Sequence, residues 1–219
     1  MLYSENEYAF VNRAYAVILI LFSILSVSLS PIQGVLWINS WSTDFFDLFF
    51  SRVTHFGNGV IIVPFLIILS FRKIYLSIAL AVSGLVQGLV VLICKRVLFP
   101  FAERPISELS QCAAHFISGV NVHHSNSFPS GHTVTIFGLC IFLSLCFKNR
   151  TLTYVLLILA TIVGISRVYL LQHYITDVAV GSLIGSSTSI IVFHFFENMN
   201  KPTWMTNAPR FRLRTPSQS

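Results

Sequence analysis

Three polar segments of this sequence carry histidines, arginines and an aspartate at spacings that suit chemistry on an anionic group. In chain order they are Lys95–Pro105, Ser127–Thr133 and Ser166–Asp177. Arginine and lysine side chains bind phosphate oxygens, and imidazole can act as a nucleophile or as a general acid. The combination indicates a site for phosphoryl chemistry, provided that the fold brings the three segments together.

The second segment predicts a phosphate-binding helix start. Pro129-Ser130-Gly131-His132 precedes an apolar run, so we expect Ser130 to be the N-cap of a helix with unpaired backbone N–H groups in its first turn. Such a helix N-terminus attracts phosphate, and glycine permits a close approach. His132 would stand beside the bound anion. An ordinary capped helix with an interfacial histidine explains the same residues equally simply.

The third segment pairs a histidine with a carboxylate. His173 and Asp177 are four residues apart, so they share one face if a single helix includes both. Asp177 could then orient the imidazole and leave its other nitrogen free to attack. The simpler alternative is an acid that interacts with the helix dipole beside an interfacial histidine. Likewise, Arg167, Arg104 and Lys95 either bind an anion or extend toward lipid head groups.

The composition shows what must position these segments. The 219 residues are 54% hydrophobic and 10% charged, whereas ordinary soluble domains are about 25% charged. The net charge of +6 forms no patch of interleaved basic and aromatic residues, so nucleic acid is not an expected partner. The bases lie between or beyond long apolar blocks, which is typical of membrane proteins. We therefore expect membrane lipids to surround the protein.

We predict an all-α integral membrane fold, a six-transmembrane-helix bundle with a short interfacial helix over Ser40–Phe50 between the first two spans. Residues 1–200 would form this domain, and residues 201–219 a flexible basic cytoplasmic tail. Pro64 could kink the second span. The predicted spans are Ala14–Trp37, Gly59–Phe71, Ile74–Cys94, Thr133–Phe147, Leu152–Tyr169 and Val178–Phe196.

The distribution of bases predicts the orientation. The larger set of bases falls on the side of both termini, which the positive-inside rule places in the cytoplasm. All three polar segments then face outward, and a bacterial inner membrane suits the short loops. The larger set is Arg13, Arg72, Lys73, Lys148, Arg150, Lys201, Arg210, Arg212 and Arg214, and the other is Arg52, Lys95, Arg96, Arg104 and Arg167.

Together the motifs resemble the type 2 phosphatidic acid phosphatase (PAP2) superfamily. Its signature is Lys-x6-Arg-Pro, then Pro-Ser-Gly-His, then Ser-Arg-x5-His-x3-Asp; the second and third are intact here. The first departs from the signature, because eight residues separate Lys95 from Arg104 and seven separate Arg96 from Arg104. We favour Lys95 as the family lysine and expect the local backbone to absorb the extra residues.

The resemblance implies the role of each site residue. His173 would be the nucleophile that forms a phosphohistidine, Asp177 would orient it, and His132 would protonate the leaving oxygen and then activate water. The phosphate would be held without a metal or other cofactor by Lys95, Arg104, Ser130, Gly131 and Arg167. A zinc site that includes His123 and His124 is an alternative, although histidines in a polar loop are more often solvated.

The implied activity is hydrolysis of a phosphorylated lipid at the outer membrane face. Phosphatidate, phosphatidylglycerol phosphate, undecaprenyl diphosphate and a lipid A phosphate all fit the motifs. Transfer of the phosphoryl group to an alcohol is an alternative on the same fold. A transporter or receptor that binds an anion without chemistry is an alternative of another class, and the pairing of His173 with Asp177 argues against it.

Overall fold

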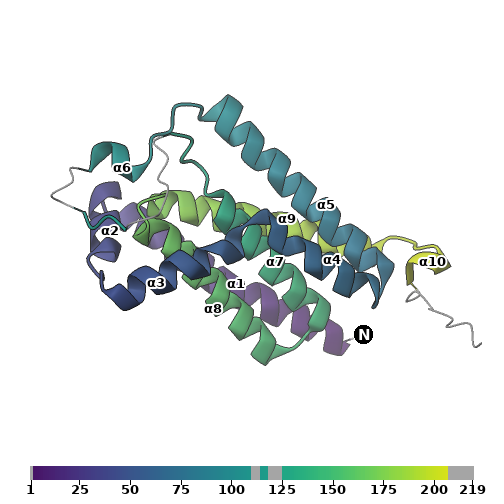
Figure 1. The fold of residues 1–219 in the computed structure, drawn as a ribbon. Coiled ribbons are helices and arrows are strands. Elements are labelled where there is room, and N and C mark those ends of the chain that lie inside the picture. The colour runs from purple at the N-terminus through teal and green to yellow at the C-terminus, as the bar shows by residue number, and fades with distance from the viewer. Residues whose placement is uncertain (1, 110–113, 118–124, 207–219) are drawn as a thin grey trace, which may run out of the picture.

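The computed structural model describes residues 2–109, 114–117 and 125–206, which form a bundle of helices (Figure 1). Within these residues the only extended pairing is an isolated bridge between Glu103 and Ser125. The long helices are α1 (Leu2–Ser28), α5 (Ile74–Ile93), α7 (Gly131–Phe147), α8 (Arg150–Tyr169) and α9 (Ile175–Asn198), and the shorter elements are α2 (Pro31–Asn39), α3 (Asp44–Val53), η1 (Thr54–Gly57), η2 (Gly59–Ile61), α4 (Ile62–Ser70), the π-turn η3 (Cys94–Leu98), α6 (Pro105–Glu108) and α10 (Thr203–Thr206).

Helix α7 is the centre of the bundle. It packs against α1, α5, α8 and α9, and most of its residues from Thr133 to Leu145 are buried. Close approach of α9 requires glycine, because a Cβ at Gly181 would lie 2.9 Å from the carbonyl oxygen of Ser130. The start of α7 is thereby fixed against the start of α9, where two of the three polar segments meet.

The helix lengths agree with an integral membrane protein but do not establish six spans. Four described segments are long and apolar enough to cross a bilayer, and the bent pair of α3–η1 with η2–α4 would make a fifth. Helix α7 is apolar but shorter than a typical span of about 20 residues. The six-span bundle stays a prediction. The four segments are Glu5–Ser28, Ile74–Leu98, Arg150–Tyr169 and Ile175–Asn198.

The predicted first span, Ala14–Trp37, is wrong in its boundaries. Helix α1 already begins at Leu2 and ends at Ser28, and a separate helix α2 follows from Pro31. The break arises because the Ser30 side chain accepts the backbone N–H of Gln33 as an N-cap, and Pro31 occupies the first helical position. The sequence is apolar on both sides of Ser30, so its hydropathy gave no sign of this break.

The second predicted span, Gly59–Phe71, nearly coincides with the helical segment Gly59–Ser70, which consists of η2 and α4. The bend of 63° between this segment and α3–η1 lies at the break between Gly57 and Gly59 rather than at Pro64. Pro64 is instead the third residue of α4, in the first turn of that helix, where proline is tolerated. Helix α3 covers most of the predicted interfacial segment and is capped by Thr43, but its place at a membrane interface stays a prediction.

The end of the described chain packs on the bundle. Residues Thr203–Thr206 form the short helix α10, and Met205 is buried against the core. Residues 203–206 therefore contact the bundle, and a flexible tail from residue 201 stays a prediction. The rest of that prediction, including Arg210, Arg212 and Arg214, falls on residues 207–219, outside the described residues.

Candidate active site

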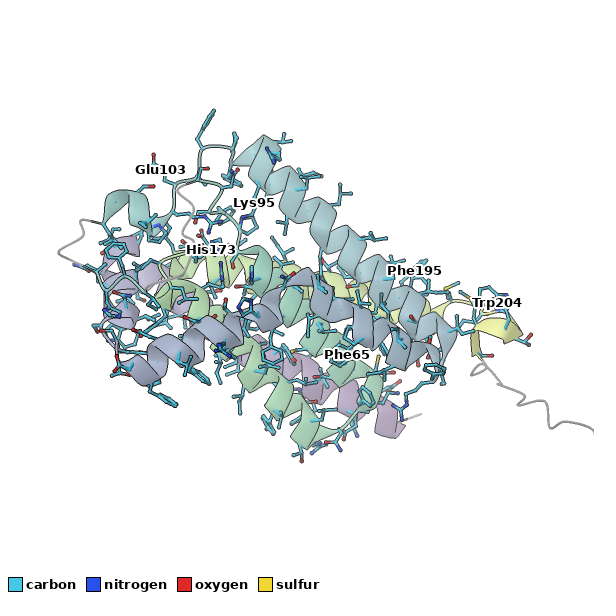
Figure 2. The ribbon with its side chains drawn as sticks, viewed as in Figure 1. Phe65, Lys95, Glu103, His173, Phe195 and Trp204 are labelled. Atoms are coloured by element: carbon cyan, nitrogen blue, oxygen red, sulfur yellow. The ribbon has the colours of Figure 1, made fainter. Side chains whose placement is uncertain are left out.

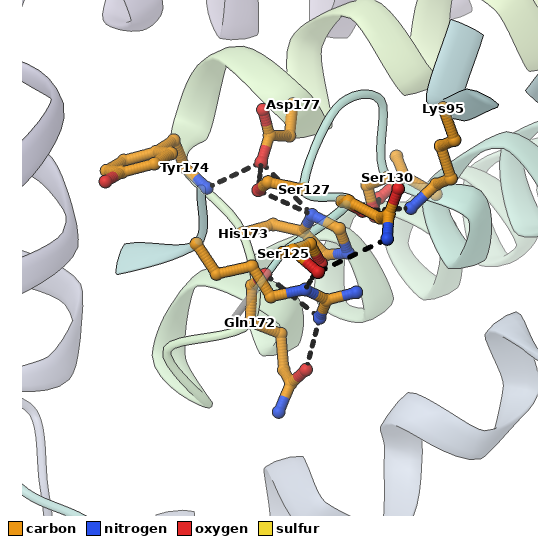
Figure 3. A network of polar contacts seen from close by, with 11 residues as sticks. Lys95, Ser125, Ser127, Ser130, Gln172, His173, Tyr174 and Asp177 are labelled. Carbon is orange, nitrogen blue, oxygen red and sulfur yellow. Dashed lines mark hydrogen bonds and ion pairs between the residues drawn. The ribbon is translucent and has the colours of Figure 1, made fainter. Parts of the chain in front are cut away.

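The three polar segments meet at the end of the bundle where α7 and α9 begin (Figure 2). Lys95 comes from the end of α5, and His173 from the turn between α8 and α9. Figure 3 shows the polar network that joins them. All eight residues predicted for the site lie in or beside this network, and the elements that hold each of them are described below.

His173 lies in a turn and not in a helix. The turn passes through Leu171, whose positive φ of 57° is unusual for leucine, and the backbone N–H of His173 donates to the carbonyl of Arg167 at 3.2 Å. The Nδ1 atom of His173 is 3.1 Å from Oδ2 of Asp177, and the two residues are 2% and 3% exposed. The arrangement leaves Nε2 on the opposite edge of the ring.

The expected reason for this contact is wrong, although the contact is present. Helix α9 begins at Ile175, so His173 and Asp177 do not share a helix face. Asp177 is in the first turn of α9, and its Oδ2 accepts the backbone N–H of Tyr174 at 3.1 Å. The carboxylate thus turns back past the helix start and reaches His173 in the preceding turn.

Ser127 completes the surroundings of the carboxylate. Its hydroxyl donates to Oδ2 of Asp177 and lies 3.4 Å from Nδ1 of His173. The residue is 1% exposed, and its backbone N–H donates to the carbonyl of Ala102 at 3.0 Å. Oδ2 therefore faces a hydroxyl, a backbone N–H and the imidazole, three groups that can hold it in one position.

Ser130 is the N-cap residue of α7, as predicted, but its side chain caps no backbone N–H. Its hydroxyl accepts a hydrogen bond from Thr133 Oγ1 at 2.9 Å, and its backbone N–H donates to the carbonyl of Asp177 at 3.2 Å. The hydroxyl therefore leaves the first-turn N–H groups of α7 available to a ligand. These N–H groups are the anion-binding feature expected of a helix start.

His132 and Gly131 form the first turn of α7. The turn at Gly57 passes so closely that a Cβ there would lie 2.7 Å from the Cβ of His132. At Gly131 an added Cβ would meet only Val91, at 3.8 Å. The protein therefore leaves space beside Gly131, next to a histidine within electrostatic range of Arg167 and His173.

Lys95, rather than Arg96, points toward the site. Its Nζ donates to the carbonyl of Asn126 at 2.5 Å, whereas Arg96 is exposed. Both residues lie in the π-turn η3, and a π-turn accommodates one more residue than an α-turn. The π-turn and the turn after it lie in the interval between Lys95 and Arg104, where the motif has its extra residues.

Arg104 is 8% exposed, and its hydrogen-bond partners are neutral oxygens. Its Nε donates to the carbonyl of Ser125 at 3.0 Å, and its Nη1 donates to Oε1 and to the carbonyl of Gln172, at 2.5 and 3.3 Å. Burial lowers the pKa of the Arg104 guanidinium from its ordinary value. The guanidinium is positioned by carbonyl oxygens, which do not neutralise its charge.

Arg167 is held in the same manner. Its Nη1 donates to the hydroxyl of Thr54 at 2.7 Å, and the residue is 8% exposed. Its Nε is buried and has no hydrogen-bond partner among the described residues. Within the described ranges, no ion pair joins Lys95, Arg104 or Arg167 to a carboxylate.

These cations determine the charge of the buried imidazole. Burial, first, and then the positive charges of Arg167, Arg104 and Lys95 hold the pKa of His173 well below its ordinary value. His173 is therefore neutral at physiological pH, the form in which imidazole is a nucleophile. Because a carboxylate only accepts hydrogen bonds, Nδ1 carries the proton and Nε2 carries the free electron pair.

The alternative metal site receives no ligand cluster from the described residues. Among them, no three His, Cys, Asp or Glu side chains are grouped so that they could share a metal ion. The two loop histidines of that alternative, His123 and His124, lie outside the described residues.

Sequence reasoning did not identify Ser127, Gln172 or Thr54 as site residues. Ser127 and Gln172 lie inside or next to the motifs, so the only available signal was a polar residue beside a predicted catalytic one. Thr54 is far from every motif in the sequence, and its contact with Arg167 depends on how η1 packs against α8.

Comparison with known proteins agrees with this arrangement. The model of the PAP2 superfamily matches residues 72–201, more than half of the chain, including all three motifs. Phosphatidylglycerophosphatase B of Bacillus subtilis (strain 168) is 29% identical over 167 residues, which cover 68% of this chain and 74% of that protein. The lipid A 4′-phosphatase of Porphyromonas gingivalis is 37% identical over 68 residues, 31% of this chain and only 27% of that protein.

A solved structure has the same architecture. The crystal structure of Aquifex aeolicus LpxE superposes with a TM-score of 0.67 at 26% sequence identity, and the match covers 75% of this chain and 94% of that one. The chain is an integral membrane protein. By its family match, its motifs and the geometry of the site, it belongs to the PAP2 superfamily.

Proposed function

We propose that this protein is a membrane phosphatase that hydrolyses a phosphomonoester or diphosphate of a lipid through a phosphohistidine intermediate. The observation that carries the proposal is a neutral, buried His173, held by Asp177 and surrounded by cations that have no carboxylate partner in the described ranges. Phosphoryl transfer requires a positioned nucleophile and neutralisation of the charge on the phosphoryl oxygens. The buried Nε of Arg167 is one donor that a phosphate oxygen would satisfy.

In the first step, Nε2 of His173 attacks phosphorus and a P–N bond forms as the P–O bond to the lipid breaks. The leaving oxygen takes a proton from His132, which stands beside the open face at Gly131. Burial and the nearby cations lower the pKa of His132 to about 3, so this step requires that the negative charge of the bound phosphate raise that pKa. The imidazole of His173 becomes cationic while it carries the phosphoryl group, and Asp177 stabilises it through Nδ1. Arg104, Arg167 and the first-turn N–H groups of α7 bind the phosphoryl oxygens.

In the second step, water replaces the lipid alcohol. His132, now neutral, takes a proton from the attacking water, the P–N bond breaks, and His173 regains its electron pair. Inorganic phosphate leaves, and His132 is again protonated for the next cycle. Transfer to an alcohol would use the same step, so that alternative differs only in which hydroxyl reaches the site.

An apolar groove beside the site supports a lipid as the substrate. A cavity of about 590 Å³ between α4, α5 and α7 runs to Gly131 and His132 and is lined mainly by apolar side chains and glycines. Ile62, Val63 and Leu85 are among its lining residues. If the phosphate of a lipid binds at His132, its hydrocarbon chain would therefore lie in this groove along α4 and α5. The lipid could enter the groove sideways from the bilayer.

The positive-inside rule favours an outward-facing site and cytoplasmic termini, and we propose that orientation in a bacterial inner membrane. The two relatives are named for different lipid phosphates, so we treat the lipid as open. Phosphate release from phosphatidate, phosphatidylglycerol phosphate, undecaprenyl diphosphate and a lipid A phosphate would test the function. We expect turnover of at least one by the purified protein and none by His173→Ala. Binding without release from any of them would favour the non-catalytic anion-binding alternative.

A further inference from the structure

A second cavity lies at the opposite end of the bundle from His173. It has a volume of about 440 Å³, within the usual range of ~300–1,000 Å³ for small-molecule sites. We call it the basal cavity. Its walls come from α1, the α4–α5 turn, the end of α7 and the last turns of α9, and its lining residues are Tyr8, Phe71, Arg72, Lys73, Tyr75, Leu76, Leu145, Cys146, Lys148, Phe193 and Glu197.

The lining carries an excess of positive charge. Arg72, Lys73 and Lys148 face a single acid, Glu197, among the lining residues. In the part of the chain that the structure describes, the ion pair at this end joins Arg150 to Glu7, and no ion pair includes a cation of the basal cavity. The cavity is therefore polar and cationic, and it is distinct from the apolar groove beside the active site.

The aromatic side chains hold the cations. Nζ of Lys148 lies 4.3 Å from the ring centre of Tyr8, and the guanidinium of Arg72 lies 4.8 Å from that of Phe147. Nζ of Lys73 lies 5.7 Å from the ring centre of Tyr75. Cation–π contacts place a positive charge without neutralising it. The three charges remain available to an anion in the cavity.

Glu197, the acid of the basal cavity, accepts hydrogen bonds from the same two tyrosines. The hydroxyl of Tyr75 donates to Oε2 of Glu197 at 2.7 Å, and that of Tyr8 donates to Oε1 at 3.4 Å. Glu197 thus fixes the two tyrosine rings on which Lys73 and Lys148 rest. It orders the site from one side, while its negative charge opposes any anion that binds there.

We propose that the basal cavity binds a phosphate-bearing anion, either the head group of an anionic phospholipid or a free phosphate. Basic pockets between membrane helices bind anionic head groups in this manner. The predicted orientation puts this end in the cytoplasmic leaflet, where anionic lipids meet juxtamembrane bases. The proposal does not depend on the catalytic activity, because the two sites are at opposite ends of α7.

The test compares variants for retained lipid by native mass spectrometry. Protein in detergent is titrated with phosphatidylglycerol, with phosphatidylcholine and with inorganic phosphate. The variant Arg72→Gln/Lys148→Gln removes two lining charges, and Arg13→Gln/Arg150→Gln removes two charges at the same end but outside the cavity. At about fivefold per charge, the first should lose about 25-fold in phosphatidylglycerol affinity and the second less than about twofold.

A third variant gives a change of opposite sign. Glu197→Gln keeps the shape of the acid and removes its charge, so phosphatidylglycerol affinity should rise by about fivefold. Displacement of the lipid by inorganic phosphate in the wild type, absent in Arg72→Gln/Lys148→Gln, would assign the free anion as a ligand. If inorganic phosphate does not displace the lipid, the ligand is the phospholipid, and its acyl chains are needed for binding. Equal losses in both double variants, equal retention of phosphatidylcholine, or weaker binding in Glu197→Gln would each overturn the proposal.

Discussion

Ser127 offers a sharp test of the proposed catalytic geometry. Ser127→Ala removes the hydroxyl that donates to Oδ2 of Asp177 and leaves that oxygen with the N–H of Tyr174 and the imidazole of His173. A hydrogen bond to a charged group contributes about 1.5–3 kcal/mol. If that contribution orients the nucleophile, kcat should fall by between about tenfold and about a hundredfold, since 1.36 kcal/mol corresponds to tenfold. KM should change little, because Ser127 touches the carboxylate and not the substrate.

The matched control is Ser125→Ala, the same substitution two residues earlier in the same segment. Ser125 is exposed, and it holds Arg104 through its backbone carbonyl, which the substitution retains. Its kcat should stay within about twofold of the wild type. In an Asp177→Asn background, Ser127→Ala should add little further loss, because both changes act on one interaction. An unchanged kcat in Ser127→Ala, or a full additional loss in the double variant, would refute a role through Asp177.

Four further outcomes are expected. An acid-labile phosphoenzyme should be trapped from an activated phosphate ester in His132→Ala but not in His173→Ala, because only the latter lacks the attacking nitrogen; phosphate on His132 would reverse the roles. The acid limb of kcat/KM should lie below pH ~6.5, since a lowered pKa keeps His173 neutral until the pH falls through that pKa, and Arg104→Gln should move this limb to higher pH. In a background without native cysteines, an impermeant thiol reagent on intact cells should label Glu103→Cys and spare Thr151→Cys, and the opposite pattern would invert the orientation. Turnover should persist in EDTA and be inhibited by vanadate, which mimics five-coordinate phosphorus; activity restored only by added zinc would contradict the mechanism.

The motifs could single out these candidate residues because the expected chemistry is local in sequence. Pro129-Ser130-Gly131-His132 marks a helix start by itself, and the structure places the start of α7 there. The contact between His173 and Asp177 was expected for the wrong reason. A separation of four residues suggests a shared helix face, but the contact arises because a first-turn carboxylate folds back past the N-cap residue Tyr174.

Features that depend on packing were not predictable. The partner of Arg167 is Thr54, which reaches it only because η1 packs against α8 and α7. The break before Pro31 was obscured by continuous apolar character, because hydropathy measures transfer into lipid and says little about backbone direction. Conversely, Lys95 was favoured over Arg96 from a motif that does not fit in length. In the structure Lys95 contacts the Asn126 carbonyl, and its role in the site stays a prediction.

The shortness of α7 determines the depth at which the reaction takes place. Seventeen residues at 1.5 Å each extend about 25 Å, less than the hydrocarbon thickness of about 30 Å. Its far end, at Lys148, is next to the basic turn that begins α8. If that turn lies at the head groups of one leaflet, the start of α7 would not reach the head groups of the other. Because α1, α5, α8 and α9 surround it, α7 need not match the bilayer thickness itself, and the longer helices carry that requirement. In the proposed orientation His132 would lie below the membrane surface, and a soluble phosphate ester would have to descend to reach it. A lipid whose phosphate already lies at that level would need no such movement, so we expect the length of α7 to favour lipid phosphates over soluble esters.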